Sequence, residues 1–241
     1  MAAPALEVEN LSAGYAGMTV LWDINLKVLE GQSVVILGAN GAGKSTLLRS
    51  IVGLLPVATG RVSFFGHDVT HLSVSRRMRR GVAFMSEQGI FPSLTIKENL
   101  QLGAMNNRDR SFEDGLGEVF DIFPDLKDRM SGLAGSLSGG QRKMLGVAKC
   151  VISEPKLLVM DEPSSGLSPK FVSEVVDVLE QLHESGLTLL VAEQNIEFMR
   201  TAHLAVVVEG GRIRFQGEIS ELESDQALHE AFFGIAGVQG V

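Results

Sequence analysis

The sequence predicts an α/β fold: a mainly parallel sheet, joined by an antiparallel β subdomain and an inserted helical subdomain. Three observations lead to this fold class. Short, continuously apolar runs alternate with helical patterns along most of the chain, two early segments alternate apolar with polar residues, and one long middle segment contains only helical patterns. Continuous apolarity is expected of strands covered on both faces, whereas alternation is expected of antiparallel strands with one face in water.

Size and composition place these elements in one domain that carries a lobe. The chain has 241 residues, of which 45% are hydrophobic, and its formal net charge is −8 at pH 7. The length suits residues 1–241 as a single domain, and the acidic balance leads us to expect no nucleic-acid partner. The single cysteine, Cys150, excludes an internal disulfide framework and lies in an apolar run that favours the core. No apolar run approaches the roughly 18 residues of a membrane helix, so we expect any membrane role to come through a partner.

The elements follow along the chain in order. Residues 6–30 and 60–68 carry the alternating pattern of the predicted antiparallel strands. The buried strands of the parallel sheet are predicted at 33–37, 82–85, 157–160, 187–192 and 205–208. Helices are predicted at 95–104, 112–120, 140–153 and 170–184, the last with Phe171, Val175, Val178, Leu179 and Leu182 on its apolar face. We place the helical subdomain at approximately residues 90–140.

A glycine-rich loop directly follows the strand at 33–37 and precedes a helix-like segment. Its sequence, GANGAGKST, fits the pattern GxxxxGK[ST] in the strand–loop–helix context that this pattern requires. Glycines let backbone amides turn toward phosphate oxygens, and the helix dipole favours the same anion. The alternative is a glycine-rich turn that matches by chance, and the flanking strand and helix argue against it. The residues predicted to bind ATP here are Gly38, Asn40, Gly41, Gly43, Lys44, Ser45 and Thr46, with Lys44 on the β and γ phosphates and Ser45 as a Mg²⁺ ligand.

Two adjacent acids, Asp161 and Glu162, end the apolar strand at 157–160. The carboxyl end of a strand opens into the crevice where α/β proteins bind ligands. Asp161 is placed to hold Mg²⁺, and Glu162 to polarise the attacking water as a general base. The alternative is that two acids simply end a strand and cap the next segment. Together with the glycine-rich loop, the acids predict a nucleotide site.

A second glycine motif, LSGGQ at 137–141, opens the helix at 140–153. A serine and two glycines at a helix start suit an anion. They equally suit a plain N-cap, with Ser138 as the capping residue. These residues alone do not decide between the two interpretations.

The order GANGAGKST, LSGGQ, LLVMDEP resembles ATP-binding-cassette (ABC) ATPases across essentially the whole chain. The resemblance implies a P-loop NTPase (RecA-like) core, ATP and Mg²⁺ as cofactors, and ATP hydrolysis coupled to transport. It implies a homodimer or heterodimer with a second cassette, transmembrane permease subunits, a solute-binding protein, and a cytoplasmic position on the inner face of the membrane. Two cassettes of this family pair head to tail, so the resemblance implies that Ser138, Gly139, Gly140 and Gln141 contact nucleotide only in trans.

Further roles carry over from the family position by position. Tyr15 resembles the aromatic residue that stacks on adenine, and Ser168 stands where many members have Asp. The loop after the strand at 82–85 normally carries a glutamine that senses the γ-phosphate and touches the permease. Either Glu87 or Gln88 fits: distance from the strand favours Glu87, and chemistry favours Gln88 as a nucleotide and Mg²⁺ contact.

The family usually has histidine where this chain has Gln194, within Glu193-Gln-Asn195. An amide can hydrogen-bond a γ-phosphate but cannot take up a proton near neutral pH, so the catalytic residues are expected to be Glu162 with Gln194 assisting. This variant resembles one of the two ATPases that power importers of branched-chain amino acids and related amides or urea. The alternatives are an ABC ATPase of another importer or exporter, and a non-transport ATP-gated clamp.

Two segments are given structural interpretations. The basic run Arg76–Arg80 is interpreted as a solvated helix face. Near the C-terminus, Phe232 and Phe233 are expected to pack on the core.

Overall fold

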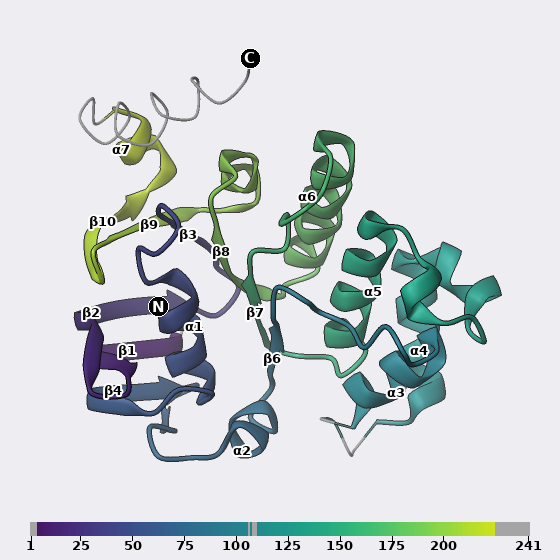
Figure 1. Cartoon of the computed structure of the whole chain (residues 1–241), viewed down its shortest axis with the longest axis horizontal. Coiled ribbons are helices and arrows are strands. Elements are labelled where there is room, and N and C mark those ends of the chain that lie inside the picture. Colours follow the sequence, from purple (N-terminus) through teal and green to yellow (C-terminus); the bar gives the residue numbers. More distant parts are fainter. Residues whose placement is uncertain (1–3, 106, 108–109, 225–241) are drawn as a thin grey trace.

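A computed structural model describes residues 4–105, 107 and 110–224. The molecule contains a six-stranded sheet and a four-stranded sheet, with helices packed around them (Figure 1). The six-stranded sheet has the order β10-β9-β3-β8-β7-β6 and is parallel except for the β9–β10 pair. The mainly parallel sheet predicted from the apolar runs is therefore confirmed.

Five of the six strands of this larger sheet, all except β10, agree with the predicted runs to within one residue. The six strands are β3 (Ser33–Leu37), β6 (Val82–Met85), β7 (Leu157–Asp161), β8 (Thr188–Glu193), β9 (Leu204–Glu209) and β10 (Arg212–Glu218). Every residue of β3, β7 and β8 is buried, as continuous apolarity requires. The sequence interpretation missed β10, an edge strand on which exposed and half-buried residues alternate.

The second sheet is antiparallel and has the order β2-β1-β4-β5. Its strands are β1 (Pro4–Tyr15), β2 (Met18–Leu29), β4 (Val57–Phe64) and β5 (His67–Asp68). Ala16 and Gly17 join the first two strands with φ of 47° and 83°, the left-handed conformation that a tight hairpin needs. The alternating segments are thus confirmed as antiparallel strands.

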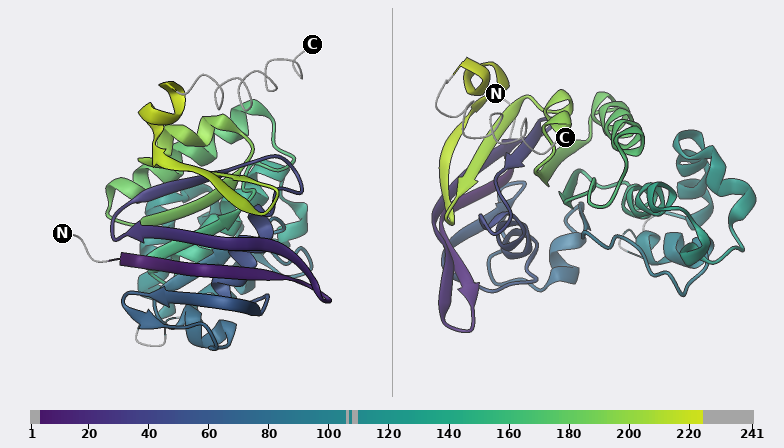
Figure 2. Two further views of the ribbon diagram at one scale, coloured as in Figure 1. Left: turned by 90° about the vertical axis from the view of Figure 1, so that its left-hand side faces the viewer. Right: turned by 45° about the horizontal axis from the view of Figure 1, so that its top comes forward.

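Helix α1 (Lys44–Val52) packs among the two sheets and carries the glycine-rich loop at its N-terminus (Figure 2). Leu47, Leu48 and Ile51 share one buried cluster with residues of both sheets, such as Leu6 and Ile36. Because this helix is buried on several sides, the loop before it starts from a fixed position.

Helices α3 to α6 lie on the other side of the parallel sheet. They are α3 (Ile96–Ala104), α4 (Phe112–Ile122), α5 (Gly139–Val151) and α6 (Pro169–Glu184), with short 3₁₀ turns at Pro124–Arg129, Ala134–Ser136 and Ile196–Thr201. Figure 1 shows α3, α4 and α5 together at one end of the molecule, where the helical subdomain is predicted. The boundary at 90–140 stays a prediction.

The predicted apolar face of α6 is partly wrong. The buried residues are Val172, Val175, Val176, Leu179 and Leu182, whereas Phe171 and Val178 are only half-buried. The apolar stripe is rotated because α6 packs against both the sheet and α5, so more than one of its faces is in contact.

The interpretation of 76–80 as a solvated helix face is wrong for Arg77. This side chain leaves short helix α2 (Val74–Met78) for the interior and is only 2% exposed. Its guanidinium donates to the carbonyl oxygens of Ser50 (3.0 Å), Ile51 (2.6 Å), Thr70 (2.7 Å) and Leu72 (3.1 Å). Two of these acceptors lie in the last turn of α1, where helix carbonyls lack intrahelical donors. Arg77 therefore closes the C-terminus of the helix whose N-terminus carries the glycine-rich loop.

Three further expectations concern Cys150, the two phenylalanines near the C-terminus and membrane-spanning helices. Cys150 is buried in the core, as predicted, and burial raises the pKa of its thiol to about 11. Helix α7 (Ile219–Ser224) ends the described part of the chain, and Phe232 and Phe233 lie outside it. Among the described residues, no helix has the length and apolarity needed to cross a membrane.

Candidate functional site

The glycine-rich loop connects β3 to α1 with little room for side chains. A Cβ at Gly38 would lie 2.4 Å from the carbonyl oxygen of Val208, and Gly43 has φ of 113°. Gly41 also has positive φ, 80°. Loop geometry therefore requires glycine at these positions, and it leaves the backbone amides free of neighbouring side chains.

Lys44 begins α1 and folds back over this loop. Its side chain is only 3% exposed, and its Nζ donates to the carbonyl oxygens of Gly38 at 2.9 Å and Ala39 at 3.3 Å. The same Nζ lies 3.3 Å from Oε1 of Glu162. A compact cation thus stands between the predicted phosphate loop and the predicted general base.

Ser45 and Asp161 meet across the crevice although they are far apart in sequence. The hydroxyl of Ser45 donates to Oδ1 of Asp161 at 2.8 Å. Asp161 is 2% exposed, and burial raises the pKa of its carboxyl, with the hydrogen bond from Ser45 acting in the opposite direction. A cation nearby would favour the charged carboxylate that burial disfavours.

These two oxygens fit a hard divalent cation. One hydroxyl and one carboxylate oxygen are the kind of donor set that holds Mg²⁺ together with substrate phosphates and water. Within the described chain, no group of three or more His, Cys, Asp or Glu side chains could hold a metal ion by itself. Ser45 and Asp161 are residues that would hold Mg²⁺, and this role, like that of Gln88, remains a prediction.

Glu162 occupies a strained position at the end of β7. Its φ is 47°, uncommon for a residue with a side chain, and its backbone amide donates to the carbonyl oxygen of Ala192 at 2.9 Å. Its side chain remains 25% exposed. A hollow of about 410 Å³ beside it is also lined by Asn40 and Gln194. The structure therefore brings the two predicted catalytic residues, Glu162 and Gln194, to one partly open cavity beside the glycine-rich loop.

Glu193 ties the loops after β7 and β8 together, and the sequence interpretation gave it no role. Its side chain is 2% exposed. It accepts hydrogen bonds from the backbone amides of Ser164 (2.6 Å), Gln194 (3.0 Å) and Asn195 (3.3 Å). Burial raises the pKa of this carboxyl, and the three amides partly offset the rise. Glu193 thus fixes Gln194 relative to the segment that follows Glu162.

Lys143, in α5, was also missed. Its Nζ donates to the carbonyl oxygens of Glu87 at 2.6 Å and Glu162 at 3.3 Å. Burial lowers the pKa of this ammonium, and the nearby carboxylates of Glu87, Glu193, Glu162 and Asp161 oppose that effect. A lysine within a helix is a weak sequence signal, because nothing in the sequence shows which carbonyl oxygens it will meet.

The choice between Glu87 and Gln88 stays open. The carboxylate of Glu87 accepts a hydrogen bond from the hydroxyl of Ser165 at 3.1 Å, so it faces the loop after β7. Gln88 is exposed. Contact of Gln88 with nucleotide or Mg²⁺ remains a prediction.

Tyr15 lies at the tip of the β1–β2 hairpin and is 42% exposed. The glycine-rich loop is reached instead by the β9–β10 turn, where the amide of Gly211 donates to the carbonyl oxygen of Ala42 at 2.9 Å. That turn is fixed in place by Trp22, whose amide donates to the carbonyl oxygen of Gly211 at 2.8 Å. Stacking of Tyr15 on adenine stays a prediction.

The LSGGQ segment forms a complete N-cap for α5. Ser138 Oγ accepts from the amide of Gln141 at 3.3 Å, and Oε1 of Gln141 accepts from the amide of Ser138 at 3.1 Å. Gly140 is buried, and a Cβ there would lie 2.2 Å from the ring of Phe171. Gly139 is exposed, and its Cβ would have no neighbour closer than 3.9 Å. The capping interpretation is confirmed, and binding of nucleotide in trans by this segment remains a prediction.

Comparison with known proteins identifies relatives of this chain by sequence and by structure. A family model described as "ABC transporter" matches residues 21–165. The chain is 34% identical to the high-affinity branched-chain amino acid transport ATP-binding protein BraG of Pseudomonas aeruginosa, over 95% of this chain and 99% of that protein. It is 32% identical to the lipopolysaccharide export system ATP-binding protein LptB of Escherichia coli K12, over 95% and 97%. A solved ADP conformation of an ATP-binding cassette from an ABC transporter superposes with a TM-score of 0.82 at 26% identity, covering 96% of this chain and 99% of that one.

Proposed function

The chain belongs to the ABC transporter family as an ATP-binding subunit that hydrolyses ATP, and we propose that it powers the import of branched-chain amino acids or related small polar solutes. The solute class is supported by the similarity to BraG over nearly the whole chain. The Glu193-Gln194-Asn195 segment resembles that group of importers and supports the same solute class.

One observation carries the enzymatic part of this proposal. Ser45 and Lys44, from one end of the chain, contact Asp161 and Glu162, which are more than 100 residues away in sequence, at 2.8 Å and 3.3 Å. Phosphate-binding groups and acids thus face each other in one crevice at the carboxyl ends of β3 and β7.

Each of these groups has a distinct part in hydrolysis. The loop amides and the dipole of α1 hold the phosphates, and Lys44 neutralises charge on them. Ser45 and Asp161 would hold Mg²⁺, which would supply further positive charge to the phosphate oxygens. Glu162 orients a water and accepts its proton, and Gln194 positions groups at the γ-phosphate through its amide. Thr46, Asn40 and Tyr15 are proposed as further nucleotide contacts.

Members of this family work as dimers with transmembrane permease partners. For this chain we propose that Ser138, Gly139, Gly140 and Gln141 complete the nucleotide site of a second cassette, identical or different. Gly140 also serves the packing of α5 against Phe171. A solute-binding protein completes the proposed importer, and the chain is held at the inner face of the membrane by its permease.

The docking surface for the permease is proposed at α3 and the loop after β6. Apolar side chains are exposed there: Phe91 at 52%, Leu102 at 39% and Met105 at 71%. Such exposure is expected of residues that another protein covers.

Transport by the assembled complex tests the proposal. The chain is purified with its permease, placed in vesicles and supplied with ATP, with labelled leucine and the solute-binding protein outside. We expect ATP-dependent uptake that the Glu162→Gln complex lacks. If the complex hydrolyses ATP yet moves none of leucine, valine, amides or urea, the solute assignment is wrong while the ATPase assignment stands.

Export is the second candidate, and the similarity to LptB supports it. The same vesicles distinguish the two directions. An exporter would move its substrate away from the side on which ATP is hydrolysed and would need no solute-binding protein.

A further inference from the structure

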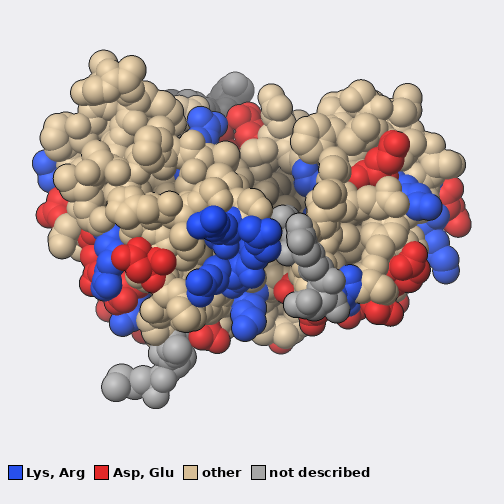
Figure 3. Space-filling view, turned by 90° about the horizontal axis from the view of Figure 1, so that it is seen from below, with Lys and Arg blue, Asp and Glu red and all other residues tan. Residues whose placement is uncertain are grey.

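A cluster of cations lies on one face of this acidic chain. Arg76, Arg79, Arg80 and Lys156 are all exposed, and within the described residues none of them forms an ion pair. Figure 3 shows Lys and Arg side chains gathered in the middle of this face. We call these four residues the basic patch. Unpaired cations concentrated in one place on a protein of net charge −8 create a local positive field.

The patch is held in a fixed arrangement by buried contacts. Arg77, within the same run, is anchored to four carbonyl oxygens in the interior and so fixes α2. The carbonyl oxygen of Gly81 accepts from the amides of Lys156 at 2.7 Å and Leu157 at 3.0 Å, which joins the two segments that carry the patch. Because its backbone is fixed, the patch loses little backbone entropy when a partner binds.

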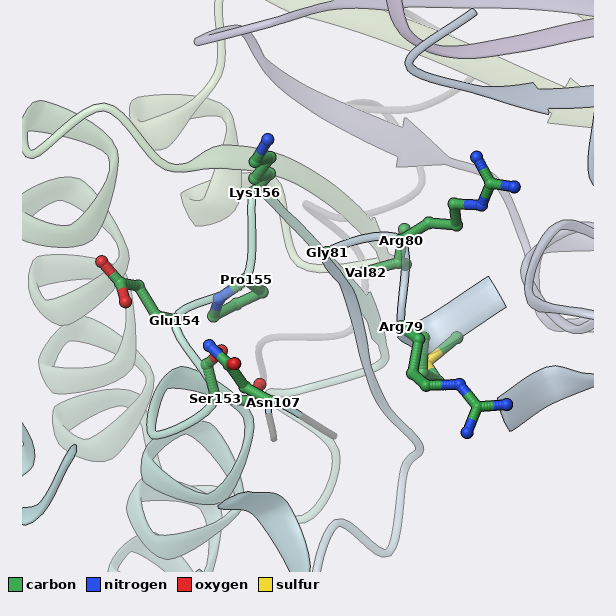
Figure 4. Close-up of a pocket in the computed structure, with 10 residues that line it drawn as sticks. Arg79, Arg80, Gly81, Val82, Asn107, Ser153, Glu154, Pro155 and Lys156 are labelled. Atoms are coloured by element: carbon green, nitrogen blue, oxygen red, sulfur yellow. The ribbon is translucent and has the colours of Figure 1, made fainter. Parts of the chain in front are cut away.

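A hollow of about 450 Å³ adjoins the patch. Figure 4 shows Arg79 and Arg80 on one side of it, and Ser153, Glu154 and Asn107 on the other. Both guanidinium groups point away from Glu154, which forms an ion pair with Arg110 at 3.5 Å. The one acid at the rim thus leaves the arginines free to meet carboxylates from outside.

The position of the patch separates it from the nucleotide site. Arg79 and Arg80 precede the first residue of β6, and Lys156 precedes the first residue of β7. Asp161 and Glu162 stand at the opposite, carboxyl end of β7. The patch therefore serves neither the phosphates held by this chain nor the second cassette, whose LSGGQ segment must face the carboxyl ends.

The hollow also reaches the helical side of the molecule. Asn107 follows α3, and its side chain donates to the carbonyl oxygen of Ser153 at 3.1 Å. The patch is thus continuous with the part of the chain near Met105, where the permease is proposed to dock.

We propose that the basic patch is a contact surface for an acidic cytoplasmic segment of the permease subunit. This inference rests on the proposed function and gives the docking partner its chemistry. Carboxylates on a peptide can form paired hydrogen bonds with the exposed arginine side chains at the edge of this hollow. Met105, two residues before Asn107, is 71% exposed, and an apolar surface beside the patch suits a protein segment rather than lipid headgroups. A protein segment therefore fits this surface better than lipid headgroups do.

Charge reversal tests the patch in the assembled transporter. The patch variant carries Arg79→Glu and Arg80→Glu together. The control variant carries Lys27→Glu and Lys127→Glu, which make the same change in net charge at exposed sites elsewhere. We expect the isolated patch variant to bind ATP with the wild-type affinity. We expect it to capture at least about tenfold less permease than the wild type and to release it at lower salt, because opposite charges at the contact become like charges. The control pair is expected to assemble as the wild type does.

The outcomes separate the two proposals. If the wild-type chain captures no permease, the proposed function fails. If wild type and patch variant capture permease equally at every salt concentration, only the patch proposal fails.

A photo-crosslinking residue at position 79 of the full complex identifies the occupant. We expect the crosslink to fall on a permease segment rich in Asp and Glu. A crosslink to a neutral segment or to the second cassette would overturn the proposal. So would binding of the free wild-type chain to phosphatidylglycerol vesicles that is lost in the patch variant.

Discussion

The glycine-rich loop and the LSGGQ segment share one design but differ in how complete they are. Each sets glycines at the N-terminus of a buried helix. Within the loop at 38–46, Ser45 contacts Asp161 at 2.8 Å and Lys44 contacts Glu162 at 3.3 Å, so this region meets two acids of the same chain. The LSGGQ segment is closed by its own cap, and its Gly139 faces open space. The first region contains most of the proposed nucleotide site, and the second is proposed to complete a site in another cassette.

The largest expected effect belongs to the complete region. Glu162→Gln keeps the shape and loses the general base, so hydrolysis should fall by about 10²–10⁴-fold while Mg-ATP affinity is retained. Steady-state ATPase assays of the assembled transporter, with calorimetry on the same protein, measure both. Wild-type turnover in this variant would remove Glu162 from its role.

Next comes Lys44→Ala, which acts on binding itself. Its ammonium makes charged hydrogen bonds, each worth about 1.5–3 kcal/mol, so we expect affinity for Mg-ATP to drop by about tenfold to a hundredfold. Titration calorimetry checks this, with circular dichroism to show that the variant is folded. Unchanged affinity would contradict the assignment of the loop.

Lys143→Met probes the link between α5 and the acids. Losing the donor to the carbonyl oxygens of Glu87 and Glu162 should lower kcat roughly tenfold, the value of one charged hydrogen bond, with ATP affinity unchanged. Lys143→Arg, which keeps a donor, should recover part of the rate. Lys127→Met is the exposed control. If ATP affinity fell by the same factor as kcat, Lys143 would have a general structural role rather than a specific effect on the acids.

The two glycines of LSGGQ should respond differently. Gly140→Ala places a methyl group 2.2 Å from the ring of Phe171, and overpacking of this kind costs about 1–3 kcal/mol of unfolding free energy. Gly139→Ala has room and should leave stability unchanged. Urea unfolding of both variants tests the contrast, and equal stabilities would show that the two positions are not distinguished by packing.

The smallest expected effect is a pH dependence from Glu193. Because burial raises the pKa of this carboxyl above its ordinary value of 4.5, the folded chain holds the proton to higher pH than the unfolded chain. Its stabilising contribution is therefore full below the unfolded pKa and is lost as pH rises through the folded pKa. Each pKa unit of difference corresponds to about 1.4 kcal/mol.

Residue 193 cannot titrate in the Glu193→Gln variant. The free energy of unfolding of the wild type should therefore fall relative to that of the variant as pH rises from about 4.5. Urea titrations across this range give the difference directly, and most other groups cancel in it. A difference that stays constant with pH would show that burial does not raise this pKa.

Much of this comparison could be predicted from the sequence because its signals are local. The apolar run Ser33–Leu37, the glycines after it and the acids after β7 each report their own surroundings. Gly139 and Gly140 look alike in sequence, and only the position of Phe171 separates them.

What the sequence did not predict depends on long-range packing. Arg77 looks like its solvated neighbours but donates to carbonyl oxygens of α1 and of Thr70, in the loop after β5. Lys143 and Glu193 bond to backbone atoms of distant loops, and such partners leave no side-chain pattern to recognise. The edge strand β10 was missed because it carries no continuous apolar run.

Gly139→Asp tests most directly whether the glycine-rich loop binds nucleotide in its own chain while LSGGQ contacts the nucleotide of a second cassette. This change adds a negative charge to an exposed position that has room for it. Calorimetric titration of Mg-ATP into the isolated variant should give the wild-type affinity, although the assembled variant hydrolyses ATP far more slowly. An affinity loss matching that of Lys44→Ala would show that LSGGQ binds nucleotide within its own chain and would contradict this account.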